Sequence, residues 1–161
     1  MRVGPTLDQL LKEYPEDVRI AYKQHPLPMH QNAMIAAEAA MAANAQGKFR
    51  EMHAKLLTPG AVLSREKILE VAKEIGLDVD RFTKDLDGHA HKAEIDAMTA
   101  EVMKLGAGGT PATFVNGRFV SGAQPYEAFK KLVDEALAKG KAADPAAAAA
   151  AAGPATAPKN P

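Results

Sequence analysis

The stretch "GGTPATFVNG", residues 108–117, joins a glycine-rich turn to a Thr-Pro step and a strand-like run. Proline cannot donate to a β-ladder, so Pro111 is expected at the first position of a strand rather than inside one. Ala112–Val115 and Arg118–Ser121 flank Asn116-Gly117. This dipeptide favours a two-residue type I′ turn, because both of its central positions need positive φ. We therefore predict a β-hairpin that starts at a stiff corner.

Upstream of the hairpin, the chain begins with a helix and a strand. Apolar side chains recur at helical spacing from Leu7 to Tyr14, and Pro15 is expected to end that helix. Residues 18–23 alternate, with Val18, Ile20 and Tyr22 on one side, which predicts a strand. The segment "QHPLPMH" that follows is rich in proline and predicts a loop.

Residues 30–105 have the pattern of four or five successive helices. Residues 30–46 are very rich in alanine, and Phe49 begins a second apolar stripe. Ser64 and Asp78 are candidate N-caps of two further helices. A last helix with a broad apolar face is expected over residues 126–137. The order of elements predicts an α/β fold with a helical insertion.

Two segments in this order resemble the DsbA-type thioredoxin-fold domain of bacterial thiol-disulfide oxidoreductases. They are "RVGPTLDQLLKEYPEDVRIAYKQHPLPMHQNA" and "KLGAGGTPATFVNGRFVSGAQPYEAF". The Gly-Thr-Pro-x-x-Phe-Val-Asn-Gly stretch and the upstream Lys-x-x-Pro-Leu segment carry the resemblance together. It covers nearly all of residues 2–138. The expected fold is therefore thioredoxin-like, with a helical insertion.

The resemblance also implies a site. In that family a proline matching Pro111 follows a cis peptide bond and faces a Cys-x-x-Cys pair, and the residue matching Thr110 helps to hold substrate polypeptide. Thr110 and Pro111 are therefore the candidate substrate-binding residues. By the same resemblance, both cysteines and the strand before them would precede Met1, so we expect an N-terminally truncated domain. The neighbours of that strand would have unpaired edges, which favours a strand-donating partner or a swapped dimer.

Composition excludes several kinds of site. The 161 residues hold 20 basic and 20 acidic side chains, which does not favour a nucleic-acid surface, and no apolar run is long enough to span a membrane. There is no cysteine, so no residue of this chain can be the thiolate that disulfide exchange requires. His89 and His91 are spaced to point to different faces of a helix, and we expect neither a metal site nor a cofactor.

The C-terminal residues differ in composition from the rest. After Leu137 no bulky apolar side chain occurs, and the run of alanine, proline and glycine cannot form a core. We predict a DsbA-like domain over residues 1–139 and a disordered tail or linker over residues 140–161. The first residues have no export signal, although the resemblance implies a periplasmic or other extracytoplasmic location.

Three hypotheses for function remain open. The first is a thiol-disulfide oxidoreductase domain that is redox-inactive as given, because its cysteines are missing. The second is a redox-inert module that binds unfolded or cysteine-containing polypeptides near Pro111. The third is a glutathione-dependent relative of the kappa-class transferase or isomerase type. Five methionines could line a binding groove, but their helical spacing favours core packing: Met34, Met41, Met52, Met98 and Met103.

Overall fold

The computed structural model describes residues 3–140. Backbone contacts divide these residues into two compact units. One unit, called here the hairpin unit, consists of residues 3–20 and 111–140, and the other, the helical unit, of residues 21–110. The tail predicted over residues 140–161 lies outside the described residues from position 141 onward.

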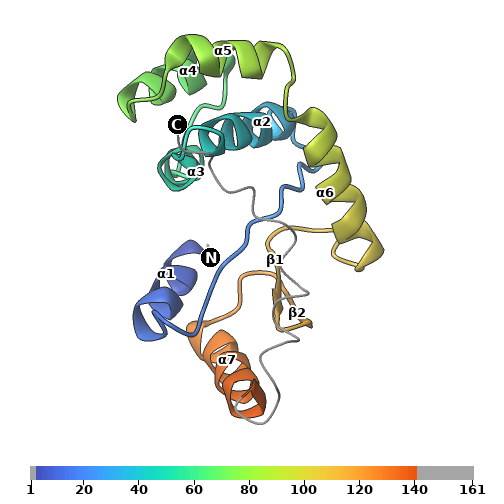
Figure 1. Cartoon of the computed structure of the whole chain (residues 1–161). Helices are drawn as coiled ribbons and strands as arrows, with labels where there is room; N and C mark the ends of the chain where they lie inside the picture. The colour runs from blue at the N-terminus through green and yellow to red at the C-terminus, as the bar shows by residue number, and fades with distance from the viewer. Residues whose placement is uncertain (1–2, 141–161) are drawn as a thin grey trace, which may run out of the picture. The chain divides into compact units, whose positions relative to one another are not determined.

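The helical unit confirms the block of helices predicted from periodicity. In Figure 1 its helices follow one another from the blue-green to the yellow part of the chain. Among the described residues it contains five: α2 (Ala33–Asn44), α3 (Phe49–Leu56), α4 (Arg65–Glu74), α5 (Val79–Asp87) and α6 (Lys92–Lys104). Helix α2 lies at the centre, since it contacts each of the other four.

Two of these helices begin at the predicted N-caps. The hydroxyl of Ser64 accepts a hydrogen bond from the backbone N–H of Lys67, with 3.3 Å between nitrogen and oxygen. The carboxylate of Asp78 accepts one from the N–H of Arg81 at 3.0 Å. Each cap satisfies a backbone donor that the first helical turn leaves without a partner.

The main core of the helical unit combines large side chains with alanines of α2. Phe82, Met52 and Ile68 are fully buried or nearly so. They form one cluster with several smaller buried residues: Ala39, Ala42, Ala43, Ala72, Leu77 and Leu86. Because alanine has only a methyl group, α2 can lie close to the helices that surround it.

A second cluster decides the role of the methionines. Met41 is buried with Ala37 and Ile95, and Met34 and Met98 pack against them. Met52 belongs to the main core, whereas the side chain of Met103 is exposed. The preference for core packing is thus confirmed for four of the five residues, although partly buried Met34 also lines a hollow of the helical unit.

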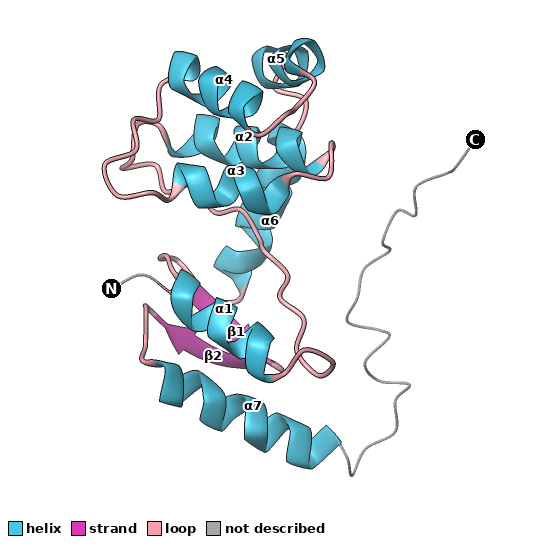
Figure 2. Cartoon of the chain, turned by 90° about the vertical axis from the view of Figure 1, so that its left-hand side faces the viewer, coloured by secondary structure: helices cyan, strands magenta, loops and turns pink. Residues whose placement is uncertain are grey.

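The hairpin unit contains two helices and a two-stranded sheet. Helix α1 spans Gly4–Glu13 and α7 spans Tyr126–Gly140, and between them in sequence lie β1 (Ala112–Val115) and β2 (Arg118–Ser121). The strands are antiparallel, and α7 packs against both α1 and β1 (Figure 2). The turn residues have positive φ, 45° at Asn116 and 81° at Gly117, as the predicted hairpin requires.

Polar side chains join α1 to α7. The Tyr14 hydroxyl donates to Asp134 at 2.6 Å, and Lys130 forms hydrogen bonds with Tyr14 and Glu13. Tyr126 donates to Glu13 as well, and that carboxylate raises the pKa of Tyr126 to about 12. Leu10 of α1 and Phe129 of α7 are buried. These contacts hold the first and last described helices of the chain together.

The strand predicted over residues 18–23 is not present, and this prediction was wrong. Within residues 3–140 the one sheet consists of β1 and β2. The exposure nevertheless alternates as expected, with Val18, Ile20 and Tyr22 half-buried and the residues between them exposed. Alternation predicts which side chains face inward, but a strand also needs a neighbouring backbone to pair with.

Candidate functional site: the free edge of strand β1

The predicted site residues lie directly before β1. Thr110 is exposed and Pro111 is half-buried. The carbonyl oxygen of Pro111 accepts a hydrogen bond from the N–H of Gly122 at 2.9 Å, which continues the ladder one pair beyond Ala112 and Ser121. Pro111 therefore occupies the first paired position of the hairpin, where its missing N–H does not interrupt the strand.

The register shows which backbone groups of β1 are available to a partner. In an antiparallel ladder, residues alternate between pairs that exchange hydrogen bonds and pairs that do not. Since the backbone of Pro111 bonds to the opposite strand, the N–H and C=O groups of Thr113 and Val115 also point towards β2. The N–H and C=O groups of Ala112 and Phe114 point outward. Within the described residues β2 is the sole neighbour of β1, so this outer side is a free edge.

The side chains at this edge form an apolar surface. Phe114 and Phe119 are directly opposite in the ladder, and their ring centroids are 5.1 Å apart. These rings are 37% and 47% exposed, respectively. On the other face of the sheet, Val115 and Arg118 line a hollow together with Leu132 of α7. One face of the hairpin is thus covered by α7, and the other presents two aromatic rings beside the free edge.

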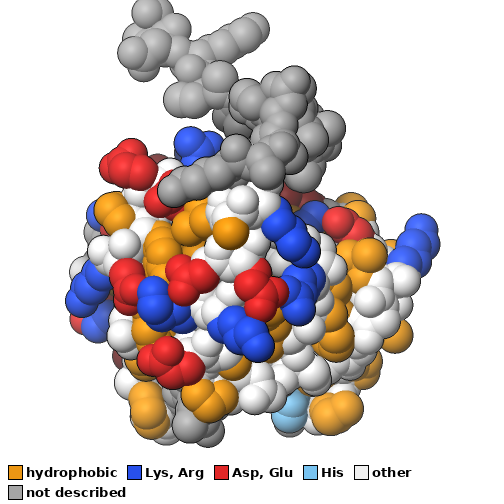
Figure 3. Space-filling view, turned by 90° about the horizontal axis from the view of Figure 1, so that it is seen from below, with side chains coloured by type: hydrophobic (Ala, Val, Ile, Leu, Met, Phe, Trp, Pro, Cys, Tyr) orange, Lys and Arg blue, Asp and Glu red, His pale blue; other side chains and the backbone are white. Residues whose placement is uncertain are grey.

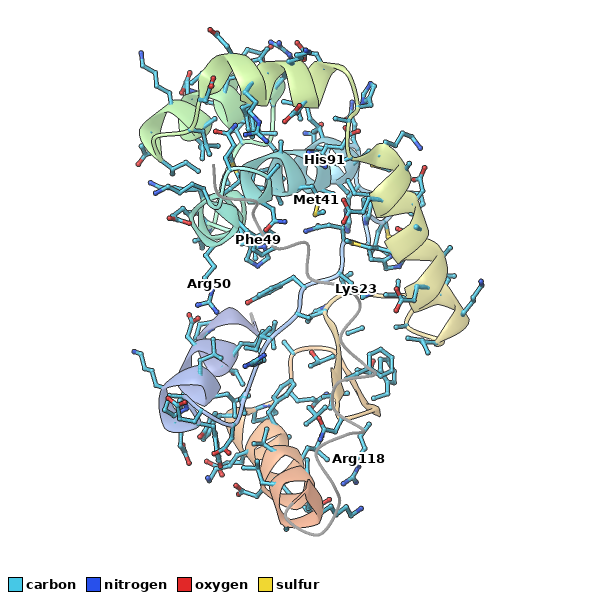
Figure 4. The ribbon with its side chains drawn as sticks, viewed as in Figure 1. Lys23, Met41, Phe49, Arg50, His91 and Arg118 are labelled. Atoms are coloured by element: carbon cyan, nitrogen blue, oxygen red, sulfur yellow. The ribbon has the colours of Figure 1, made fainter. Side chains whose placement is uncertain are left out.

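The histidines occupy separate environments. His53 stacks on Phe49 at 5.2 Å between ring centroids and lies 4.9 Å from the ring of Tyr22. In Figure 4, Phe49 projects from α3 towards the extended segment that carries Lys23. Burial lowers the pKa of His53 below its ordinary value of 6.5, because a charged imidazole loses hydration among these rings.

We expect His53 to make stability depend on pH. The unfolded chain takes up a proton at the ordinary imidazole pKa, whereas folded His53 resists it, so the free energy of unfolding falls as the pH drops from the ordinary value through the folded pKa. His53→Phe keeps a ring and removes the proton. Thermal melts between about pH 5 and 7 should show a flatter dependence for this variant. The exposed His30→Phe serves as the control, and equal slopes in all three proteins would contradict the assignment.

The remaining histidines form no metal centre among residues 3–140, where no group of three or more potential metal ligands occurs. Both ring nitrogens of His25 are buried without a hydrogen bond, as is Nε2 of His91. His89 Nδ1 lies 2.9 Å from Oε1 of Glu38.

Glu38 is a residue that sequence reasoning missed. It is the one buried charged side chain among the described residues, at 3% exposure. A signal was present, because Glu38 is the sole Asp, Glu, Lys or Arg between residues 30 and 47. An isolated acid in a run of buried alanines points to a carboxylate that needs a partner in the fold.

Charges on the surface are mixed in sign. Figure 3 shows a face on which Lys and Arg side chains lie between those of Asp and Glu. Several pairs are close enough to be ion pairs, among them Lys23 with Glu101 at 2.6 Å and Arg65 with Asp87 at 2.6 Å. No helix among residues 3–140 is sufficiently long and apolar to cross a bilayer.

Similarity to known proteins shows the family to which this chain belongs. A family model described as a DSBA-like thioredoxin domain matches residues 4–134. The chain belongs to the DsbA-like thioredoxin family. This confirms both the resemblance and the fold class that were predicted from sequence. DsbA-like proteins are generally extracytoplasmic and act on substrates that contain cysteine.

Two solved structures support the DsbA-like fold. A thioredoxin-like oxidoreductase from Silicibacter pomeroyi has a TM-score of 0.76 and 29% identity, covering 85% of this chain and 78% of that one. The thiol-disulfide exchange protein alpha-DsbA2 from Wolbachia pipientis has a TM-score of 0.73 and 27% identity, covering 83% of this chain and 73% of that one. This DsbA-like chain differs from the pattern expected of its family in having no cysteine among its 161 residues.

The curated relatives of the DsbA-like chain are much longer proteins. A Na⁺/H⁺ antiporter NhaA from Herminiimonas arsenicoxydans is 37% identical over 115 residues, covering 71% of this chain and 18% of that protein. An antiporter NhaA 1 from Salinispora arenicola is 36% identical over 137 residues, covering 83% of this chain and 21% of that protein. The chain therefore spans about a fifth of the length of these relatives.

Proposed function

We propose that the part of the chain matched by the family model, residues 4–134, is a polypeptide-binding domain of the DsbA-like family. An extended segment of an unfolded or cysteine-containing polypeptide would pair with the free edge of β1, next to Thr110 and Pro111. The observation that carries the proposal is the outward direction of the N–H and C=O groups of Ala112 and Phe114. Main-chain hydrogen bonds of this kind give affinity for an added strand with little dependence on its sequence.

The aromatic pair supports the same proposal. Alternate side chains of an added strand would lie on the same face as Phe114 and Phe119, whose rings are partly exposed. Burying aromatic surface stabilises association, at about 25 cal/mol for each Å² removed from water. An unfolded polypeptide offers an unpaired backbone and apolar side chains along its whole length, whereas most of these groups are paired or buried in a folded protein. The edge is therefore suited to partners that are not yet folded.

Thiol-disulfide exchange is not proposed for these residues by themselves. The reaction forms a mixed disulfide after a thiolate attacks a sulfur atom, and the chain has no cysteine to supply either group. If exchange takes place on a bound polypeptide, its thiols come from the substrate or from a separate protein. The cis peptide bond expected before Pro111 stays a prediction, as does a truncated start.

Two other activities have less support. Glutathione-dependent transfer or isomerisation was the third hypothesis, but the solved neighbours are described as a thioredoxin-like oxidoreductase and a thiol-disulfide exchange protein. Sodium/proton exchange is the activity named for the longer curated relatives. Our proposal concerns the part of the chain that the DSBA-like family model matches, residues 4–134.

Proline substitutions on the two edges of the hairpin test the proposal. Ala112→Pro removes an outward N–H and places a ring on the free edge, but it leaves the bonds between β1 and β2 in place. Ser121→Pro makes the same change at the paired position on the opposite edge. Fluorescein-labelled, reduced and carboxymethylated α-lactalbumin, which stays unfolded, is titrated with each protein, and binding is followed by anisotropy.

We expect the unsubstituted chain to bind this probe and Ala112→Pro to weaken binding about tenfold, which corresponds to ~1.4 kcal/mol. Ser121→Pro should leave the affinity within about twofold, which is ~0.4 kcal/mol. Equal losses in both variants would show that the β1 edge is not the site. Sedimentation at the same concentrations shows whether a second copy of the chain occupies the edge instead, as a strand-donating or swapped dimer would.

A further inference from the structure

The helical unit has a hollow with a buried carboxylate at its wall. Its volume is about 370 Å³, and its apolar lining comes from Met34, Ile35 and Leu86. Glu38 and His89 also line it, with the former on α2 and the latter between α5 and α6. In Figure 1 the connection from α5 to α6 turns beside the N-terminal half of α2. Volumes of this size are typical of small-molecule sites.

The two polar residues differ sharply in exposure. The side chain of Glu38 is 4% exposed, whereas that of His89 is 66% exposed. His89 bonds through Nδ1 to Oε1 of the carboxylate at 2.9 Å, and Oε2 is the oxygen left for a ligand. Because so little of the Glu38 side chain is exposed, its carboxylate attracts a cation that reaches it more strongly than a fully exposed carboxylate would.

His89 is held in an unusual backbone conformation. Its φ is +52°, in the left-handed region that residues other than glycine rarely adopt. Such conformations cost on the order of 1–3 kcal/mol and persist where surrounding contacts impose them. Here the backbone bonds that end α5 impose it, from the N–H of His89 to the oxygen of Leu86 at 3.2 Å and from the N–H of Ala90 to the oxygen of Asp85 at 2.9 Å. The hydrogen bond to Glu38 orients the imidazole over the carboxylate. An exposed side chain can move away from this position when another donor takes its place.

The other charged residues of the hollow offset each other. Arg65 binds Asp87 through two hydrogen bonds, 2.8 Å from Nε to Oδ1 and 2.6 Å from Nη2 to Oδ2. The guanidinium lowers the pKa of Asp87, which keeps that carboxyl ionised. Since this pair is internally neutral, Glu38 is the charge that remains to select a ligand.

We propose that the hollow binds a small organic cation, an ammonium or guanidinium group carried on an apolar stem. The cationic group donates to Glu38 in place of His89, and the stem lies against Met34, Ile35 and Leu86. This inference does not rest on polypeptide binding at the β1 edge, and the two proposals can fail separately.

Butylammonium chloride is the probe, and 1-butanol and sodium butyrate are its neutral and anionic analogues. Each is titrated into the ¹⁵N-labelled chain at mildly alkaline pH, and amide shifts around the hollow are followed by NMR. We expect butylammonium to shift these resonances saturably at millimolar concentration, with weaker effects from the alcohol and the carboxylate. Equal binding of 1-butanol, or no saturable shift, overturns the proposal.

Two variants and a control locate the interaction. Glu38→Gln keeps the shape of the side chain and removes its charge, and we expect it to lower butylammonium affinity about tenfold. His89→Gly is compatible with the positive φ at this position, because glycine adopts it without strain. It also removes the imidazole from the Glu38 carboxylate, so butylammonium should bind more tightly. The exposed Glu70→Gln should change nothing. Unchanged affinity in both hollow variants overturns the proposal. If Glu38→Gln does not fold, the affinity of His89→Gly and the comparison of butylammonium with 1-butanol test the proposal instead.

Discussion

Phe82→Ala should destabilise the chain by about 3–5 kcal/mol, the usual cost of removing a fully buried phenylalanine ring. The ring lies on α5, is completely inaccessible to solvent and belongs to the same cluster as Met52 and Ile68. Alanine at this position would leave a cavity that the surrounding helices, already packed on α2, fill only in part. Urea denaturation followed by far-UV circular dichroism measures the loss.

Phe119→Ala is the matched control for this substitution. The same atoms are removed, but the ring is 47% exposed and its aromatic contact is with Phe114. We expect a loss of at most about 1.5 kcal/mol, the upper range for such an aromatic pair. Similar losses for the two variants would mean that Phe82 is not at the centre of the helical core.

Ala42→Leu should be the second severe substitution, with a loss of about 1–3 kcal/mol or more. Ala42 is fully buried in the main cluster, on the helix that contacts α3, α4, α5 and α6. A leucine there adds three carbon atoms to a side chain that is already fully buried, so either its rotamer is strained or a neighbouring helix shifts. Thermal and urea unfolding both report the change.

Ala97→Leu tests whether packing is the cause. Ala97 is on the exposed side of α6, and alanine and leucine have similar helix propensities. This variant should stay within about 0.5 kcal/mol of the unsubstituted chain. If Ala42→Leu were equally mild, our inference that α2 packs tightly against its neighbouring helices would be wrong.

Local sequence signals predicted the helices and the hairpin well because short-range physics determines them. Ser64 and Asp78 each cap a helix with their own side chains, and Asn116-Gly117 adopts the positive φ values that its turn requires. The stretch around Pro111 predicted a strand start for the same kind of reason, since proline cannot donate to a ladder. None of these features needs a distant partner.

The errors and omissions concern interactions between distant residues. Residues 18–23 keep the alternating exposure of a strand, yet pairing depends on a second backbone that the pattern cannot supply. Glu38 was overlooked because its partner His89 lies 51 positions away, on the connection between α5 and α6. The outward groups of Ala112 and Phe114 also required the register, which one strand alone does not define.

The sequence by itself determined the family, the succession of helices with the hairpin near the end, the strand start at Pro111, and the absence of any thiol among the 161 residues. Those properties follow from residue identity and from interactions within a few positions. The tertiary structure alone decided which backbone groups of β1 point outward, which methionines are core, and that a carboxylate is buried under a histidine. Each of these depends on burial and on hydrogen bonds between residues that are distant in sequence, and such contacts exist only after the chain has folded.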